Sequence, residues 1–280
     1  MKTLYAVSAV SLLIITLISC AGGPADSIQR EAEPENAVVE EAAVQMLTIW
    51  RPDSVVFKYI DGTIDKTIKY SYDEMGNELL SEEYDGTGEL LHSYKSHFNQ
   101  GVLISKEVYD SSSLTGTSLF EIDGNGNISR IVKQDANGDI QSIVINSYQE
   151  DILMSSSTYD SNEVPNLKMI YSYQGDVLAG IEYQLPDGRV DARLLRIIEN
   201  GLPVEEKMVL SDKSVESSRS FMYENGVLRA ETQYAAMMKI KSVEYDYDDN
   251  GNRIRETWSD RSGNEYEVIE RSWTSFEISE

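Results

Sequence analysis

The side chains with the widest chemical repertoire are few in this sequence of 280 residues. Its two histidines, His92 and His97, lie five residues apart within one segment of alternating polarity. An odd spacing in a β-strand places two side chains on opposite faces, so these histidines are not expected to share a metal ion. The sequence therefore predicts neither a metal centre nor a catalytic histidine, and we expect no cofactor.

Carboxylates are abundant, because 48 acidic residues stand against 24 basic ones. Adjacent acids, as in Glu82-Glu83 and Glu205-Glu206, could supply the two carboxylates that a glycosidase uses. In so acidic a chain such pairs arise from composition alone. We therefore expect a protein that is not an enzyme, and keep as an alternative an envelope enzyme acting on glycan with acids on a concave face.

The segment from Asp123 to Asn127 resembles the start of a calcium loop. An EF-hand has Gly at its sixth position and Glu at its twelfth, where this chain has Ile128 and Gln134. Hairpin turns built on Asx and Gly account for the segment more simply. No calcium site is predicted here.

Cys20 is the single cysteine of the chain, so no intramolecular disulfide can form. It follows an uncharged run from Leu4 to Ile18, whose length suits a signal peptide and is short for a membrane-spanning helix of ~20 residues. The stretch Leu17-Ile18-Ser19-Cys20 resembles the lipobox of bacterial lipoproteins. That resemblance implies cleavage between Ser19 and Cys20, and a thioether-linked diacylglycerol on Cys20. The alternative is an ordinary secretory signal, or an uncleaved anchor, with an incidental cysteine.

Composition limits the partners of the mature chain. Removal of residues 1–19 takes away one positive charge, Lys2, and changes the net charge from −24 to −25. Such a chain repels nucleic-acid phosphates, so no nucleic-acid partner is expected. Residues 20–44 read as the lipidated cysteine and an acidic, flexible tether. Ala21 and Gly22 lack the Asp that often retains lipoproteins in the inner membrane, which favours the outer membrane.

Turn signals recur through the rest of the chain with a period of about 25 residues. The first series is Gly76, Gly101, Gly126, Asp151, Gly175, Gly201, Gly226 and Gly251. The second series lies halfway between and is Gly62, Gly88, Ser113, Gly138, Glu163, Gly188, Lys213 and Gly263, with a weakly marked member near Met238. The intervening segments alternate and are rich in Val, Ile, Tyr and Thr, which is typical of β-strands joined by tight hairpins.

Residues 45–280 are therefore predicted to form an all-β domain, an antiparallel meander of consecutive hairpin repeats. A lone hairpin cannot bury an apolar face, so neighbouring hairpins must pair into one long twisted or curled sheet. We expect this sheet to be open or shell-like. A transmembrane barrel would need a continuously apolar lipid face, which the segment Glu216-Ser217-Ser218-Arg219-Ser220 does not provide.

Seventeen tyrosines accompany the repeat, and several precede the glycine turns. Examples are Tyr72, Tyr173, Tyr223 and Tyr247. Aromatic pairs across neighbouring strands stabilise sheets, so a structural role is the favoured interpretation. An exposed aromatic ladder that binds a glycan or a peptide is the alternative.

The repeat also resembles a known family. Tyr70-Ser-Tyr72-Asp73 and Tyr245-Asp-Tyr247-Asp248 look like the YD repeat of Rhs-type wall proteins, and MORN repeats are a weaker resemblance. The YD resemblance implies hairpins that spiral into a sheet or shell at a bacterial surface. Unlike the large family members, this chain is short and shows no appended toxin domain.

Together these features predict a bacterial lipoprotein of the cell envelope, attached to the membrane through its lipid. Its acidic repeat sheet would serve protein or glycan contact, or envelope scaffolding. An immunity-like protein that neutralises a basic toxin is a further alternative, because a strongly acidic surface attracts basic partners.

Overall fold

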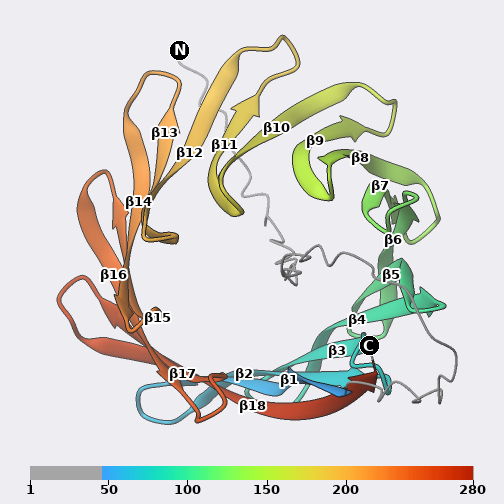
Figure 1. The fold of residues 1–280 in the computed structure, drawn as a ribbon. Coiled ribbons are helices and arrows are strands. Elements are labelled where there is room, and N and C mark those ends of the chain that lie inside the picture. Colours follow the sequence, from blue (N-terminus) through green and yellow to red (C-terminus); the bar gives the residue numbers. More distant parts are fainter. Residues whose placement is uncertain (1–45, 280) are drawn as a thin grey trace, which may run out of the picture. The chain divides into compact units, whose positions relative to one another are not determined.

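In the computed structural model the described residues are 46–279. Ser19, Cys20, the signal peptide and the tether lie outside them. The described chain consists of eighteen β-strands in sequence order, and each strand pairs with its predecessor in an antiparallel manner (Figure 1). The strands are β1 Met46–Tyr59, β2 Ile64–Tyr72, β3 Glu78–Asp85, β4 Leu90–Asn99, β5 Val102–Asp110, β6 Ser113–Ile122, β7 Ile128–Asp135, β8 Ile140–Gln149, β9 Ile152–Asp160, β10 Pro165–Gln174, β11 Val177–Gln184, β12 Val190–Glu199, β13 Leu202–Leu210, β14 Val215–Glu224, β15 Val227–Ala235, β16 Met238–Tyr247, β17 Arg253–Asp260 and β18 Glu265–Ser279.

The meander of hairpins is confirmed, but the open or shell-like sheet is wrong. The first strand, β1, pairs with β2 on one side and with the last strand, β18, on the other. The β1–β18 register runs from Met46 opposite Ser279 to Tyr59 opposite Glu267. The sheet therefore closes into an eighteen-stranded barrel. Closure leaves no unpaired edge at the seam, which removes the principal liability of a long open sheet.

The hairpins are joined by two-residue turns and by longer turns. Asn200-Gly201 and Asn225-Gly226 have positive φ at both residues, as a two-residue type I′ hairpin requires. Gln100-Gly101, Glu150-Asp151 and Ala236-Met237 have the same backbone, whereas the turn at Asn250-Gly251 is longer and only its glycine, with φ 82, is left-handed. The regular spacing also predicts turns at Glu163 and Lys213, where there is no glycine. Both residues have a left-handed backbone, with φ 60 and 70, so these turns are confirmed.

The two strand faces differ in burial. Along β12 and β16 the residues with alternate numbers are buried and exposed in turn. The more buried set includes the tyrosines before the glycine turns and is called the tyrosine face. Side chains on the concave side of a closed sheet converge, so we infer that the tyrosine face lines the inside of the barrel. The other set is called the outer face.

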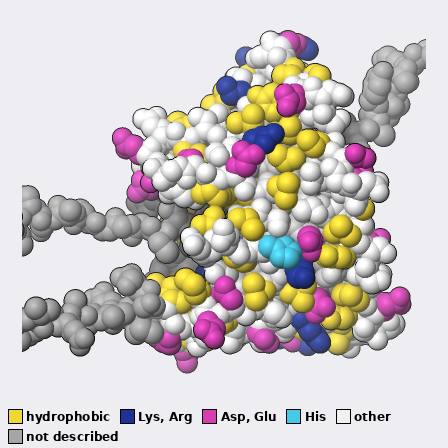
Figure 2. Space-filling view, turned by 90° about the vertical axis from the view of Figure 1, so that its right-hand side faces the viewer, with side chains coloured by type: hydrophobic (Ala, Val, Ile, Leu, Met, Phe, Trp, Pro, Cys, Tyr) yellow, Lys and Arg dark blue, Asp and Glu magenta, His cyan; other side chains and the backbone are white. Residues whose placement is uncertain are grey.

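Both faces carry charged side chains in the middle of strands. Lys95 and Arg193 lie on the outer face, and Glu206 and Arg219 on the tyrosine face. In a space-filling view, hydrophobic side chains form separate groups among polar and charged ones (Figure 2). Within the described strands neither face is the continuous apolar band that a lipid-facing barrel wall needs. Within residues 46–279 no helix has the length and apolarity to cross a membrane.

Candidate functional site

The tyrosines before the glycine turns donate hydrogen bonds to main-chain carbonyls of the preceding strand, and each such bond is called a latch. The hydroxyl of Tyr173 donates to the main-chain carbonyl of Leu153, which lies twenty residues earlier, at 2.8 Å. Equivalent bonds run from Tyr72 to Pro52, Tyr148 to Ile128, Tyr223 to Pro203 and Tyr247 to Leu228. Each latch lies at a register shift of its hairpin, where a β-bulge interrupts the ladder. These hydroxyls are engaged in holding the sheet, which supports the structural interpretation over a binding ladder.

Buried acids on the tyrosine face are paired with arginines. The Glu206 side chain is 5% exposed and accepts from Arg196 at 2.8 Å and from Arg219. Arg219 of β14 also lies 3.6 Å from Glu231, so it bridges two buried carboxylates on the strands either side of its own, β13 and β15. Ion pairs of this kind satisfy carboxylates that burial would otherwise leave uncompensated.

A second cluster of the same kind lies on β17 and β18. Glu256, whose side chain is 6% exposed, contacts Arg271 at 2.6 Å and Arg253 at 3.3 Å. Its other oxygen accepts a hydrogen bond from the indole of Trp258 at 3.1 Å. Such a neutralised carboxylate is a structural partner rather than a free acid or base.

The spacing of these buried acids is a signal present in the sequence. Glu206, Glu231 and Glu256 are 25 residues apart and so occupy one position of the repeat. The adjacent acids of the pair Glu205-Glu206 face opposite ways, so composition alone does not account for the pair. Glu205 is on the outer face and pairs with Lys207 at 2.8 Å. Glu205 and Glu206 are thus distinguished by their positions in the repeat.

The histidines lie apart, as their spacing predicts. His92 is 3.8 Å from Asp110, while His97 is 3.3 Å from Glu107. The register places these two contacts on opposite faces of β4 and β5. Among the described residues, no group of His, Cys, Asp or Glu has the arrangement of a metal site.

Aspartates at the hairpin turns hold the turn backbone. The Asp123 carboxylate accepts from the amides of Asn125 at 2.9 Å and Asn127 at 3.0 Å. The Asn127 side chain donates to Asp151 of the next turn at 2.8 Å. Hydrogen bonding, mainly from the Asn127 amide, lowers the pKa of Asp123. The resemblance to a calcium loop is thus explained by turn geometry.

Glu267 is an acid whose pKa is raised above its ordinary value. Burial, followed by the negative charge of Asp65, raises the pKa of Glu267, while Lys241 and Lys66 oppose the shift. Carboxylates with raised pKa values occur at catalytic sites and also in structural clusters. Glu267 does not line the hollow formed by Met222, Arg229 and Glu244.

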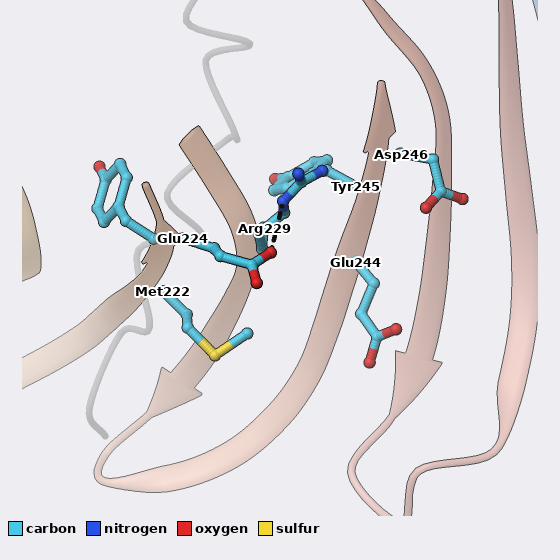
Figure 3. A pocket seen from close by; sticks show the side chains of 7 residues that line it. Met222, Glu224, Arg229, Glu244, Tyr245 and Asp246 are labelled. Atoms are coloured by element: carbon cyan, nitrogen blue, oxygen red, sulfur yellow. Dashed lines mark ion pairs between the residues drawn. The ribbon is translucent and has the colours of Figure 1, made fainter. Parts of the chain in front are cut away.

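An open hollow of ≈ 610 Å³ lies where β14, β15 and β16 approach one end of the barrel (Figure 3). Its lining residues are Glu224, Arg229, Glu244 and Asp246, the apolar Met222, and Tyr223 and Tyr245 of the tyrosine face. Arg229 follows a register shift between β14 and β15, and its Nε lies 3.3 Å from Glu224. Figure 3 shows Glu224 and Arg229 turned toward one another, while the Glu244 side chain comes from another strand and points away from them. Sequence reasoning missed this group, because the hollow depends on which strands become neighbours.

No protein-family model matches the chain, and no curated protein matches it. Among solved structures, a porin-like protein from Bacteroides uniformis is similar at a TM-score of 0.44 and 10% identity, over 80% of this chain and 96% of that chain. A porin-like protein from Bacteroides vulgatus has a TM-score of 0.37 and 12% identity, over 80% and 98%. The protein TcdB2-TccC3-TEV has a TM-score of 0.29 and 15% identity, and the match spans 76% of this chain but 15% of that one. Similarities this low assign neither a family nor a function, so the architecture rests on the strand pairing of the chain itself.

Proposed function

We propose that this chain is a bacterial envelope lipoprotein, anchored through Cys20, whose barrel is a non-enzymatic contact module with an acidic surface. Anchoring is supported by the lipobox resemblance of Leu17-Ile18-Ser19-Cys20, and envelope location by the YD-like repeat. The outer membrane is the proposed destination, with the barrel held at the end of an acidic tether.

The observation that carries the contact role is the charge on the outer face. Charged side chains such as Lys95, Arg193 and Glu244 lie in mid-strand on that face and are exposed to solvent. Charges at this depth oppose burial in a bilayer, which favours a barrel that stands in water on a lipid tether. The buried acids Glu206 and Glu256 are held by arginines, which favours a structural role over acid–base catalysis.

The test compares the native chain with Cys20→Ala in cells. Mass spectrometry of the native N-terminal peptide should detect acylated Cys20. The variant should leave the membrane fraction on washing with alkaline carbonate, which removes peripheral proteins. A Cys20→Ala chain that resists this extraction would show that the barrel itself is embedded, and would overturn the proposal.

Protease treatment of intact cells then locates the barrel. Release of barrel peptides from whole cells would support a surface contact role. Full protection would support a periplasmic scaffold or an immunity-like protein.

A glycan-acting enzyme is a second candidate, favoured by the raised pKa of Glu267. It predicts release of reducing sugar from purified cell-wall glycan by the native chain. It also predicts that Glu267→Gln abolishes this release, while Glu265→Gln, two residues away on the same strand, retains it. An inactive native chain would remove the candidate.

A further inference from the structure

Three neighbouring hairpin tips at one end of the barrel expose large apolar and aromatic side chains. These tips join β15 to β16, β17 to β18 and β1 to β2, and each tip comprises the turn and two residues on either side of it. Because β16 pairs with β17 and β18 pairs with β1, the tips follow one another around the rim (Figure 1). Six strands at ~4.8 Å spacing make this segment about 24 Å wide. The apolar rim is defined by its exposed side chains Tyr59, Ile60, Ile64, Met237, Met238 and Tyr266.

Composition sets the apolar rim apart from the rest of this end of the barrel. Its three tips carry three basic residues, Lys58, Lys239 and Arg261, against four acidic ones. The six other hairpin tips at this end carry two basic residues against eleven acidic ones. In the described chain those six tips expose two large apolar side chains, Ile140 and Val164. The apolar rim is therefore a nearly neutral, hydrophobic sector of an otherwise acidic barrel end.

Met237 has a backbone conformation that its side chain disfavours. It is the second residue of a two-residue turn and has φ 70, whereas Gly201 and Gly226 occupy the same position in other turns. A left-handed backbone is strained for a residue that has a Cβ atom. The Met237 side chain is 86% exposed, so packing within the chain does not offset this strain. Contact with something outside the chain would account for a strained and exposed apolar residue.

We propose that the apolar rim rests on the surface of a neutral phospholipid membrane, with Ile60 and Met237 inserted at the boundary between head groups and acyl chains. The proposal goes beyond the contact function above and rests on the lipid anchor proposed there. Tyr59 and Tyr266 suit this depth, because aromatic side chains with a polar end concentrate at membrane interfaces. Separate tips also suit a deformable surface, whereas a rigid protein would need a shape matched to each of them.

The tether is long enough to bring this end of the barrel to the bilayer. Cys20 and Met46 are 26 residues apart, which allows a separation of up to roughly 90 Å. β1 begins at the end of the barrel opposite the apolar rim, and a ten-residue strand such as β16 spans about 33 Å. Anchoring also keeps the rim at a high local concentration beside the bilayer, so weak insertion suffices for contact.

The first test places a fluorescent reporter at the rim. Residues 21–280, produced without the signal sequence, contain no cysteine, so Met237→Cys provides a single site for the fluorophore NBD. Phosphatidylcholine vesicles should raise the emission of this label and shift it to shorter wavelength, because the label enters an apolar medium. The same label at Met222→Cys, exposed at the opposite end, or at Leu195→Cys, exposed on the outer face in mid-strand, should not respond.

The second test removes the apolar side chains. Ile60→Ser with Met237→Ser should weaken cosedimentation with the same vesicles by at least about 10-fold, since each change removes an apolar side chain from the interface. The matched control, Ile145→Ser with Leu195→Ser, removes two exposed apolar side chains from the outer face. It should weaken binding by less than about 2-fold. Melting curves establish that both variants fold.

A silent label at residue 237, or equal weakening by the two double variants, would overturn the proposal. A rim that instead joins two copies of the chain would also overturn it, and sedimentation velocity would then show a dimer that Ile60→Ser with Met237→Ser dissociates. Failure of the rim in these tests leaves acylation of Cys20 untouched. A response of the label at residue 195 would mean an embedded barrel, which overturns the function proposed above as well.

Discussion

Arg219 binds the buried carboxylate of Glu206 from the neighbouring strand, and it does so while reaching the carboxylate of Glu231 on its other side. One arginine thereby joins β13, β14 and β15. Removal of an arginine from a buried pair leaves a charge without compensation, which is costlier than loss of a surface pair.

Arg219→Ala is therefore expected to destabilise the barrel by about 1–3 kcal/mol, moderated because Glu206 retains Arg196. Urea unfolding followed by circular dichroism measures the change. Arg130→Ala, which breaks a pair with the more exposed Glu121, should cost less than about 1 kcal/mol. Equal losses in the two variants would contradict a special role for the buried network.

Tyr173→Phe removes the hydroxyl of one latch and preserves the ring. Loss of its bond to the Leu153 carbonyl should destabilise the chain by about 0.5–1.5 kcal/mol. The matched control is Tyr159→Phe, because the Tyr159 hydroxyl makes no hydrogen bond within the described chain. The comparison is made by thermal unfolding, and a latch variant as stable as the control would count against the latch.

Glu267→Gln is expected to raise the melting temperature at pH 7. Since the folded-state pKa of Glu267 is raised, its ionised form costs stability at neutral pH, and the cost disappears as the pH falls below the ordinary value of 4.5. The gain of the variant should therefore vanish at about pH 4. Glu265→Gln, an exposed change on the same strand, serves as the reference. A gain that persists at low pH would indicate a cause other than charge.

The turn aspartates should produce the opposite pH dependence. Hydrogen bonds from Thr87 and from the Glu89 amide hold the pKa of Asp85 below 3.8. Its contribution to stability is then present above that value and is lost as the pH falls through the lowered pKa. Asp85→Asn should flatten the decline in melting temperature between about pH 5 and pH 3. Asp191→Asn is the control, because the Asp191 carboxylate accepts no hydrogen bond in residues 46–279.

Local features of this fold were predictable from the sequence because they depend on nearby residues. The left-handed backbone at Gly201 and Gly226 follows from Asx-Gly chemistry, and the regular spacing located the turn at Lys213 without a glycine. The opposite faces of His92 and His97 follow from strand periodicity. The weakly marked turn near Met238 is formed by Ala236 and Met237, which have φ 42 and 70.

Closure and the hollow could not be predicted in this way, because they depend on long-range pairing. Lys58 opposite Val268 is a pairing that no hairpin rule specifies. Similarly, the hollow brings together Met222, Arg229 and Glu244, which come from three different strands. A repeat with a period of 25 residues determines how each hairpin pairs with the next, but it does not determine how many hairpins are needed to close the barrel.

The seam between β1 and β18 has a consequence for how the protein is made. Seventeen strands can pair with their predecessors as they appear, whereas the partner of Val55 is Arg271, near the other end of the sheet. Until β18 arrives, β1 and the last strand already formed each present bare main-chain donors and acceptors, which are templates for joining another chain. Assembly must therefore end in a single slow, long-range step, and a chain interrupted before residue 265 would be prone to join its neighbours.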